Sequence, residues 1–318
     1  MMAIKPKKTK QKKPKKSTEA KPKIPFPIIR SLVETRCDFQ DQRIRTQSRI
    51  VNNVFRNQIK EEKLEKYGIM EIFDDAESFE NKIEKMLIIE LQKYPIWNKY
   101  LSHIYGIGAV LASGLIAYIE DPIRFRNISS LWEYSGFGYN RFCKDCNEPT
   151  FVEIKFKTGN KTVKAKRLKP FDLCTGCGKE TIPIIQRRQK GYMSNWNDRL
   201  KRMCWLVSQS FLKQGKKSFY YNLYKTFREE EKQKHPKKIV KDGKTFFNDG
   251  HLTNRAMRKV IKIFIAHLWI KWREIDGLDV TEPYVKTILG HDAIKPVMDK
   301  KCNQPNCEVD RFISEVKK

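Results

Sequence analysis

Two pairs of cysteines constrain the middle of the chain more than any other feature of its sequence. Cys143 and Cys146 form one CxxC motif, and Cys174 and Cys177 form a second one after 27 intervening residues. Two such knuckles can place four thiolates around one tetrahedral Zn²⁺ ion. Because four cysteine ligands leave no open coordination position, the spacing predicts a structural zinc site rather than a catalytic one.

The segment between the two cysteine pairs has the pattern of a β-hairpin. In "FVEIKFKTGNKTVKAKRL", polar and apolar residues alternate on both sides of a Thr-Gly-Asn turn. The hairpin and the knuckles together predict a zinc ribbon at residues 141–190, which hold thirteen basic and five acidic residues. We expect a rigid basic finger that contacts nucleic acid, and a ribbon that only staples the fold is the alternative. The candidate contacts on the hairpin are Lys155, Lys157, Lys164, Lys166 and Arg167.

The charge of the chain points to a polyanionic partner. The 318 residues carry a net charge of +28, and residues 1–23 hold ten lysines and one glutamate. Without that segment, 55 basic and 36 acidic residues remain, so the excess is not confined to the N-terminus. A chain this basic is typical of nucleic-acid-binding proteins, with DNA favoured here and RNA left open. A solubilising surface is the alternative, but it would hold lysine and glutamate in closer balance.

The hydropathy of the chain predicts no membrane partner. A helix that spans a bilayer needs about 18–20 consecutive apolar residues, and the run from Ile107 to Ile119 is shorter. The N-terminal sequence also lacks the apolar core of a secretory signal. We therefore expect a cytoplasmic protein, associated with a nucleoid or encoded by a virus or mobile element.

The two ends of the chain differ in composition from its middle. Residues 1–26 are rich in lysine and proline, so we expect a disordered basic tail. Residues 281–318 form a C-terminal extension in which Cys302 and Cys307 make a CxxxxC pair. These two thiols and His291 could form part of a metal site, and two loop thiols without a metal are the alternative.

Residues 27–101 have the pattern of a helical arm. Residues 28–66 contain no glycine or proline, and apolar residues recur at a spacing near seven, which predicts one long helix with an imperfect coiled-coil seam. The chain could form a homodimer through 28–66, and a helix packed on its own domain is the alternative. A second helix is expected from about Ser78 to Tyr94, where Pro95 ends it. The seam residues are Val33, Cys37, Ile44, Val51 and Val54.

Three glycines, Gly106, Gly108 and Gly114, lie within nine positions at the start of an apolar run. Glycine weakens a helix, so such a group needs a reason in the backbone. The pattern at residues 102–140 favours a helix–hairpin–helix, in which the turn approaches a phosphate and amides of the next helix bind it. Gly106 and Gly108 are therefore candidate nucleic-acid contacts, and a tight turn between two core helices is the alternative.

Three segments together resemble one known family. Residues 105–139, "YGIGAVLASGLIAYIEDPIRFRNISSLWEYSGFGY", resemble the C-terminal domain of the DEDD insertion-sequence transposases, which are bridge-RNA-guided recombinases. Residues 191–213 and 252–274 resemble two further helices of the same domain. The resemblance implies a helical transposase-like domain at 191–280 that binds DNA. The residues that match the family's two basic steps are Leu200, Lys201, Arg202, Ala256, Arg258 and Lys259.

The resemblance also bears on catalysis. The family combines four acidic metal ligands in a ribonuclease-H-like domain with a nucleophilic serine in the C-terminal domain. The roughly 75 residues between the tail and Tyr105 read as helices, so we expect the acidic tetrad to be absent and a DEDD-domain partner protein to supply it. Whether this chain is an enzyme is therefore left open. Ser194 is the candidate nucleophile, near Arg187 and Arg188, and a helix N-cap is its alternative role.

Side chains of two further helices are expected mainly in the core. His267 lies among apolar residues, and Phe219 and Phe227 belong to a stripe that repeats every four residues. Some tyrosines beside this stripe could still reach a nucleic acid and stack on its bases. They are Tyr220, Tyr221 and Tyr224.

The sequence therefore predicts a mainly α-helical protein with a helical arm, a helix–hairpin–helix-containing helical domain and a small β zinc-ribbon insertion. Its expected role is that of a DNA-binding, transposase-like protein in DNA transposition or recombination that depends on a partner. A non-catalytic nucleic-acid-binding module with an architectural or regulatory role is the main alternative. An RNA-binding protein outside recombination is a third interpretation.

Overall fold

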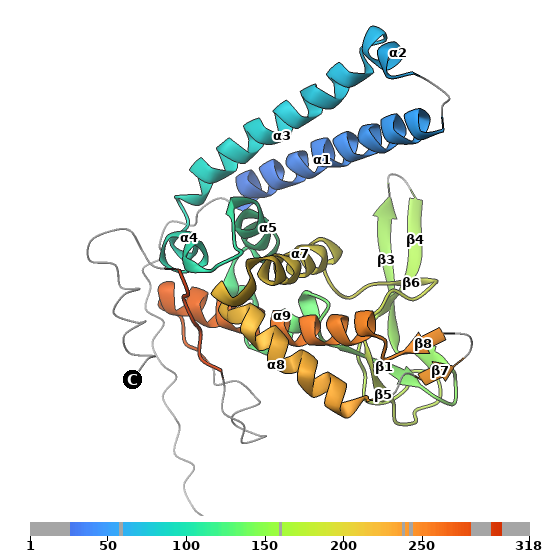
Figure 1. Ribbon diagram of the computed structural model, residues 1–318. Helices are drawn as coiled ribbons and strands as arrows, with labels where there is room; N and C mark the ends of the chain where they lie inside the picture. The colour runs from blue at the N-terminus through green and yellow to red at the C-terminus, as the bar shows by residue number, and fades with distance from the viewer. Residues whose placement is uncertain are drawn as a thin grey trace, which may run out of the picture.

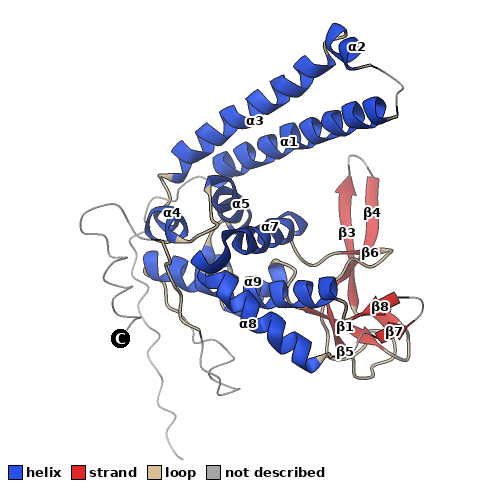
Figure 2. Ribbon diagram, viewed as in Figure 1, coloured by secondary structure: helices blue, strands red, loops and turns tan. Residues whose placement is uncertain are grey.

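The protein is mainly α-helical, with a small β insertion that contains the four clustered cysteines (Figure 2). The predicted basic tail up to residue 25, His291 and the Cys302–Cys307 pair lie outside the described residues. In the part of the chain that the structure covers, no helix is long and apolar enough to cross a membrane. The computed structural model describes residues 26–56, 60–158, 161–236, 239–241, 244–280 and 294–300.

A helical hairpin forms the arm (Figure 1). Helices α1 (Phe26–Phe55) and α3 (Ile69–Leu91) lie side by side, and the short α2 (Glu61–Lys66) precedes α3 at the tip. The buried carboxylate of Glu80 on α3 accepts hydrogen bonds from Arg36 at 2.6 Å and Arg43 at 2.9 Å on α1. Because a buried carboxylate is costly without partners, these contacts fix α1 against α3.

The helix boundaries in the arm differ from those expected. Helix α1 ends at Phe55 rather than at Lys66, and α3 begins at Ile69 rather than near Ser78. The predicted start at Ser78 was wrong, because Gly68, in the left-handed region with a φ of +66°, ends α2 and α3 follows it directly. From Ile69, α3 continues through several acidic residues to its first buried residue, Ala76.

The predicted coiled-coil seam divides into two halves. Val33 is buried against the chain's own core, whereas Ile44 and Val51 are 45% and 56% exposed. The N-terminal half of α1 lies over α5 (Ala109–Ile119) as well as beside α3, whereas the C-terminal half packs along α3, and its seam residues Ile44 and Val51 stay exposed (Figure 1). The N-terminal half is a helix packed on its own domain, and the homodimer through 28–66 stays a prediction.

Six helices of the described residues enclose the centre of the hydrophobic core, and α9 supplies its longest buried face. Val260, Phe264 and Leu268 of α9 are fully buried, at the spacing expected for one helix face. The helices expected within residues 191–213 and 252–274 are confirmed as α7 and α9. The helices are α4 (Pro95–Lys99), α5 (Ala109–Ile119), α6 (Ile128–Tyr134), α7 (Asp198–Gln214), α8 (Phe219–Lys234) and α9 (Asp249–Ile275).

The aromatic stripe of α8 faces this core. The Tyr220 hydroxyl lies 2.9 Å from Nδ1 of His267 and 3.3 Å from the hydroxyl of Tyr100. His267 is therefore a packing residue, as expected. The idea that Tyr220 reaches a nucleic acid was wrong, because its ring is fully buried and stacks on Phe211. The partly buried residues that complete the predicted core stripe are Phe219, Leu223 and Phe227.

Close packing of α5 on α7 explains two of the three clustered glycines. Gly106 has a φ of +91°, and a Cβ added there would lie 3.1 Å from the Phe211 ring. A Cβ at Gly114 would collide with Met203 on α7. Gly108 is the N-cap residue of α5, and a Cβ there would meet nothing within 4 Å. Only Gly108 therefore leaves space beside the turn.

The β insertion consists of two small three-stranded sheets. In one sheet β1 pairs antiparallel with β2 and β5, and in the other β4 pairs antiparallel with β3 and parallel with β6. The buried side chain of Gln186 ties the insertion to α6, since it accepts the Gly138 N–H and donates to the Glu133 carbonyl. The strands of these two sheets are β1 (Tyr139–Cys143), β2 (Glu148–Pro149), β3 (Phe151–Thr158), β4 (Lys161–Leu168), β5 (Ile182–Ile185) and β6 (Tyr192–Met193). Outside the insertion, β7 (Ile239–Lys241) pairs with β8 (Lys244–Phe246).

Candidate metal centre and nucleic-acid interface

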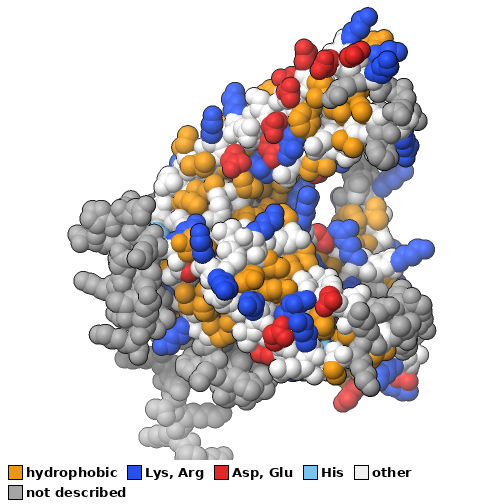
Figure 3. Space-filling view, in the orientation of Figure 1, with side chains coloured by type: hydrophobic (Ala, Val, Ile, Leu, Met, Phe, Trp, Pro, Cys, Tyr) orange, Lys and Arg blue, Asp and Glu red, His pale blue; other side chains and the backbone are white. Residues whose placement is uncertain are grey.

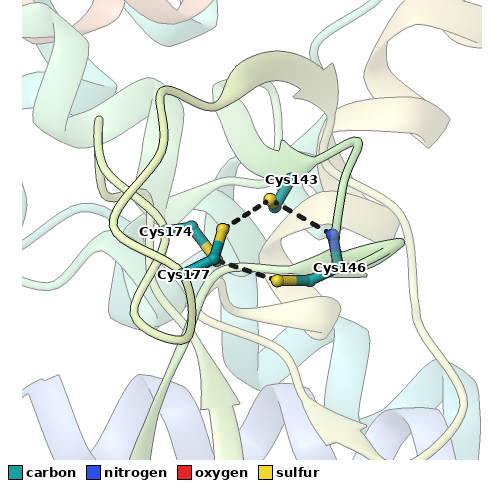
Figure 4. Close-up of side chains that lie close together, drawn as sticks. All are labelled: Cys143, Cys146, Cys174 and Cys177. Atoms are coloured by element: carbon teal, nitrogen blue, oxygen red, sulfur yellow. Dashed lines mark hydrogen bonds between the residues drawn. The ribbon is translucent and has the colours of Figure 1, made fainter.

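Four cysteines from the two ends of the ribbon converge at one point (Figure 4). The Sγ atoms of Cys143 and Cys177 lie 3.5 Å apart, and those of Cys146 and Cys174 lie 3.7 Å apart. Neighbouring sulfurs in a tetrahedral Zn–S₄ site lie about 3.8 Å apart when each Zn–S bond is about 2.3 Å. Disulfide sulfurs would be about 2.05 Å apart. The cluster therefore has the dimensions of a site that could hold a metal ion.

The backbone around the cysteines favours the thiolate form that metal binding requires. The Gly176 N–H donates to Cys174 Sγ at 3.4 Å, and the Cys146 N–H donates to Cys143 Sγ at 3.5 Å. Backbone N–H groups of Cys177 and Gly176 lower the pKa of the Cys174 thiol to about 6, because they stabilise its negative charge. The backbone thus favours the thiolate at Cys174, whereas hydrogen bonds with the neighbouring cysteine side chains, first among them Cys177, raise the pKa of the Cys146 thiol to about 12.

Lysines gather on one face of the β3–β4 hairpin. The predicted hairpin is confirmed, with pairs running from Phe151↔Leu168 to Thr158↔Lys161. Side chains alternate between the two faces of a strand, so four of the five candidate basic residues share one face. Like charges directly opposite each other destabilise a sheet, so this face would gain from a bound polyanion. The four are Lys155, directly opposite Lys164, together with Lys157 and Lys166.

The other face of the hairpin is largely apolar. Arg167 pairs with Val152 there, so the structure does not bring it together with the four lysines. Phe156 and Val163 lie opposite each other on this face, and each is 39% exposed. The hairpin thus presents two chemically different surfaces to solvent.

A cavity of about 520 Å³ lies where the base of the ribbon meets α7 and α9. Four predicted nucleic-acid contacts that are distant in the sequence line it together: Arg188, Lys201, Arg202 and Arg258. Basic residues outnumber acidic ones in its wall. We call it the basic–aromatic cavity, and its lining consists of Phe137, Arg188, Asp198, Arg199, Lys201, Arg202, Trp205 and Arg258.

Two cations of this cavity, Lys201 and Arg258, are partly buried, as is Lys262 beside them. Burial, followed by the charges of Arg258, Arg188 and Arg187, lowers the pKa of Lys201 to about 8 against the opposing charge of Asp198. Burial and Arg258 likewise lower the pKa of Lys262 to about 8. Burial and a nearby like charge both disfavour the charged form of these lysines, and a bound anion would favour it.

Aromatic rings hold several of these cations in place. The Lys201 ammonium lies 4.6 Å from the Trp196 ring centroid, and the Arg258 guanidinium lies 5.4 Å from that of Phe137. The Lys201 ammonium also donates to the Gln186 carbonyl at 3.0 Å. Cation–π contacts position a positive charge without cancelling it. The charge stays available to a ligand.

The space-filling view shows where basic side chains gather on one face of the molecule (Figure 3). Lys and Arg side chains border the opening between the helical arm and the β3–β4 hairpin. The ribbon connects directly to α7 through β6, so the hairpin and the cavity belong to adjoining parts of the fold (Figure 1).

Other predicted contacts lie elsewhere. Lys259 forms ion pairs with Glu231 at 2.8 Å and Glu230 at 3.3 Å, so its charge is already matched. The turn with Gly106 and Gly108 precedes α5, and the Tyr105 N–H beside it donates to the Asp299 carboxylate at 2.7 Å. That amide is therefore engaged within the chain.

Ser194, the candidate nucleophile, lies half-buried in the loop between β6 and α7. Helix α7 begins at Asp198, and the side chain of Asn197 accepts the Leu200 N–H at 2.9 Å as its N-cap. The alternative N-cap role of Ser194 was therefore wrong. Its role as a nucleophile stays a prediction, and the nearby Arg188 is paired with Asp198 at 2.7 Å.

Sequence reasoning missed Trp205 and Arg199, which line the cavity, and Lys262, whose pKa burial and the neighbouring Arg258 lower. Two of them carry a signal in hindsight, because they follow predicted contacts by four positions on the same helix. Trp205 follows Lys201 on α7, and Lys262 follows Arg258 on α9. Residues four apart share a helix face.

Comparison with models of known protein families gives no match for this chain, and comparison with curated proteins gives none either.

Proposed function

We propose that this protein binds nucleic acid, with DNA as the favoured partner, through the lysine face of the β3–β4 hairpin and the basic–aromatic cavity. In this proposal the four clustered cysteines hold one Zn²⁺ ion, because a set of four thiolates with this spacing suits tetrahedral zinc. The metal has a structural role. It fixes the base of the ribbon so that the hairpin has a defined position.

One observation carries the proposal. Lys155 and Lys164 face each other directly across the hairpin, and neither forms a salt bridge with any acidic residue in the described part of the chain. Lys201 and Arg258 likewise share the cavity wall without a carboxylate partner among the described residues. Such repulsion is relieved when the phosphates of a polyanion lie along both surfaces.

The recombination role rests on the resemblance to the DEDD insertion-sequence transposases. We propose that the chain contributes the nucleic-acid-binding part of such an assembly and that a partner protein contributes the DEDD chemistry. The helices of residues 26–56 and 60–103 are in keeping with a binding arm rather than a ribonuclease-H-like sheet. A non-catalytic architectural module uses the same two surfaces and differs only in having no such partner.

Salt dependence of binding tests the nucleic-acid interface. The Lys155→Gln/Lys157→Gln/Lys164→Gln variant should bind DNA more weakly, and the slope of log K against log salt should fall by about 3, since each phosphate contact contributes about 0.9. Fluorescence anisotropy between about 50 and 200 mM salt measures this slope.

A chain without residues 1–23 should still bind, because the remaining 55 basic and 36 acidic residues keep an excess of positive charge.

The matched control removes the same number of charges from the arm. Lys63, Lys82 and Lys85 are exposed on α2 and α3, so their replacement by Gln should leave the slope unchanged. Equal slopes for the two triple variants would mean that the hairpin contacts no phosphate.

A further inference from the structure

The basic–aromatic cavity has the size of a small-ligand site. Its volume of about 520 Å³ lies within the range of about 300–1,000 Å³ that is usual for pockets that bind small molecules. Helix α7 forms one wall, Arg258 of α9 forms another, and Phe137 and Arg188 come from the two ends of the ribbon. A nucleotide fits such a volume, whereas the width of a duplex does not.

The cations of the cavity differ in how far they are already neutralised. Arg188 is paired with Asp198, Arg199 with Glu34, and Arg202 approaches Asp41 at 4.0 Å. Asp198 is the single acidic residue among the lining residues, and it also accepts the Trp196 indole N–H at 2.8 Å.

Lys201 and Arg258 have no carboxylate within salt-bridge distance in the described part of the chain. They hold their positions instead through backbone carbonyls, of Gln186 and Gly138 respectively, and through aromatic rings. Carbonyl groups leave most of the positive charge uncancelled. These two side chains are therefore the place where an anionic group would be held most firmly.

Trp205 supplies an aromatic surface beside these two cations. It lies one helical turn beyond Lys201 on α7, it is half-buried, and it lines the same cavity. An aromatic ring next to a cationic pair is the arrangement by which proteins hold an unpaired nucleotide, since the base stacks on the ring and the cations take the phosphate. A base inside a continuous duplex is already stacked and cannot use such a ring.

We infer that the basic–aromatic cavity is a subsite for one unpaired nucleotide, with its phosphate at Lys201 and Arg258 and its base stacked on Trp205. The substrate class of the interface is then nucleic acid with an unpaired or flipped-out nucleotide, such as a bulge, a branch point or a single strand. This inference rests on the proposed function and names the structural feature that the interface selects.

A bulged duplex tests the subsite. The probe is a DNA duplex with one unpaired 2-aminopurine, compared with the fully paired duplex of the same length. The full chain should bind the bulged probe about 10-fold more tightly, and stacking on Trp205 should quench the 2-aminopurine fluorescence. The Trp205→Leu variant should lose that preference and the quenching, because the unpaired base then has no ring on which to stack. The Trp205→Phe variant keeps an aromatic ring and should retain part of the quenching. It therefore tests the stacking even when the leucine variant folds poorly.

The outcomes separate the two proposals. Equal affinity for the two probes, or quenching that survives in Trp205→Leu, would overturn the subsite and leave the nucleic-acid interface intact. Failure to bind either probe at low salt would overturn the proposed function and the subsite with it. A Tyr67→Leu variant, which changes an aromatic residue 75% exposed on the arm, should behave as the unmodified chain.

Discussion

A Cys174→Ser variant should purify with less than about a tenth of the zinc that the unmodified chain carries, which we expect to be one ion per chain. A structural zinc site contributes about 10–16 kcal/mol of apparent binding free energy at neutral pH, and a serine hydroxyl does not ionise to replace a thiolate. Cys174 is also the ligand whose thiolate the backbone stabilises most clearly, with a pKa of about 6. Its loss should therefore remove the metal rather than only weaken it.

Loss of the metal should also loosen the ribbon. Between Cys143 and Cys177 the sheets are small and half-exposed, so little apolar burial would hold them without the metal. Elemental analysis gives the zinc content, and amide hydrogen exchange over residues 139–185 reports the loosening. Cys37→Ser, on α1, is the matched control and should keep the full metal content. Full zinc occupancy in Cys174→Ser would show that the cysteine cluster is not the metal site.

The Lys201→Met/Arg258→Met variant should lose about 100-fold or more in DNA affinity at moderate salt. Hydrogen bonds to charged groups contribute about 1.5–3 kcal/mol each, and two of them correspond to at least a factor of about 100. The fold should not suffer in proportion, because both cations are partly buried and repel each other. Anisotropy titration and thermal unfolding of the same preparations measure the two effects.

The pH dependence of stability provides a second readout for Lys201. Its pKa is about 8 in the folded protein and near 10.5 in the unfolded chain, so between these values the unfolded state binds more protons. The stability of the unmodified chain should therefore rise with pH across this window, and the rise should be smaller in a Lys201→Met variant. An equal rise in both would mean that Lys201 titrates normally.

Lys259→Met is the matched control for the cavity variant. Lys259 is the neighbour of Arg258 on α9, but it is paired with Glu231, whose carboxyl pKa is held at about 2 largely by Lys259 and Arg255 against the opposing effect of burial. Removing Lys259 should lower stability and leave DNA affinity nearly unchanged. Loss of affinity in Lys259→Met equal to that of the cavity variant would contradict the assignment of the cavity.

The metal cluster and the hairpin could be predicted from the sequence because both depend on local patterns. The CxxC spacing determines which thiols can meet, and alternation around a short turn predicts a hairpin, whereas the register that places Lys155 opposite Lys164 comes from the structure. The helices α7 and α9 were predicted in the same way from apolar periodicity and from the resemblance.

The cavity could not be predicted, because it depends on packing between distant segments. The sequence marks Arg188, Lys201 and Arg258 as basic but does not place them around one space with Trp205. The same holds for Gly106, whose need for glycine arises partly from the Phe211 ring across the interface with α7. In the arm, the buried ion pairs of Glu80 set the partner of α1, and no heptad count reveals them.

The central claim is that nucleic acid contacts the ribbon hairpin and the basic–aromatic cavity. Photocrosslinking tests it directly: DNA that carries 4-thiothymidine is bound to the full chain at moderate salt and irradiated, and crosslinked peptides are identified by mass spectrometry. We expect crosslinks within residues 151–168 of the hairpin and within residues 196–205 at the start of α7. Crosslinks confined to residues 1–23 or to the arm helices α1 and α3 would contradict it.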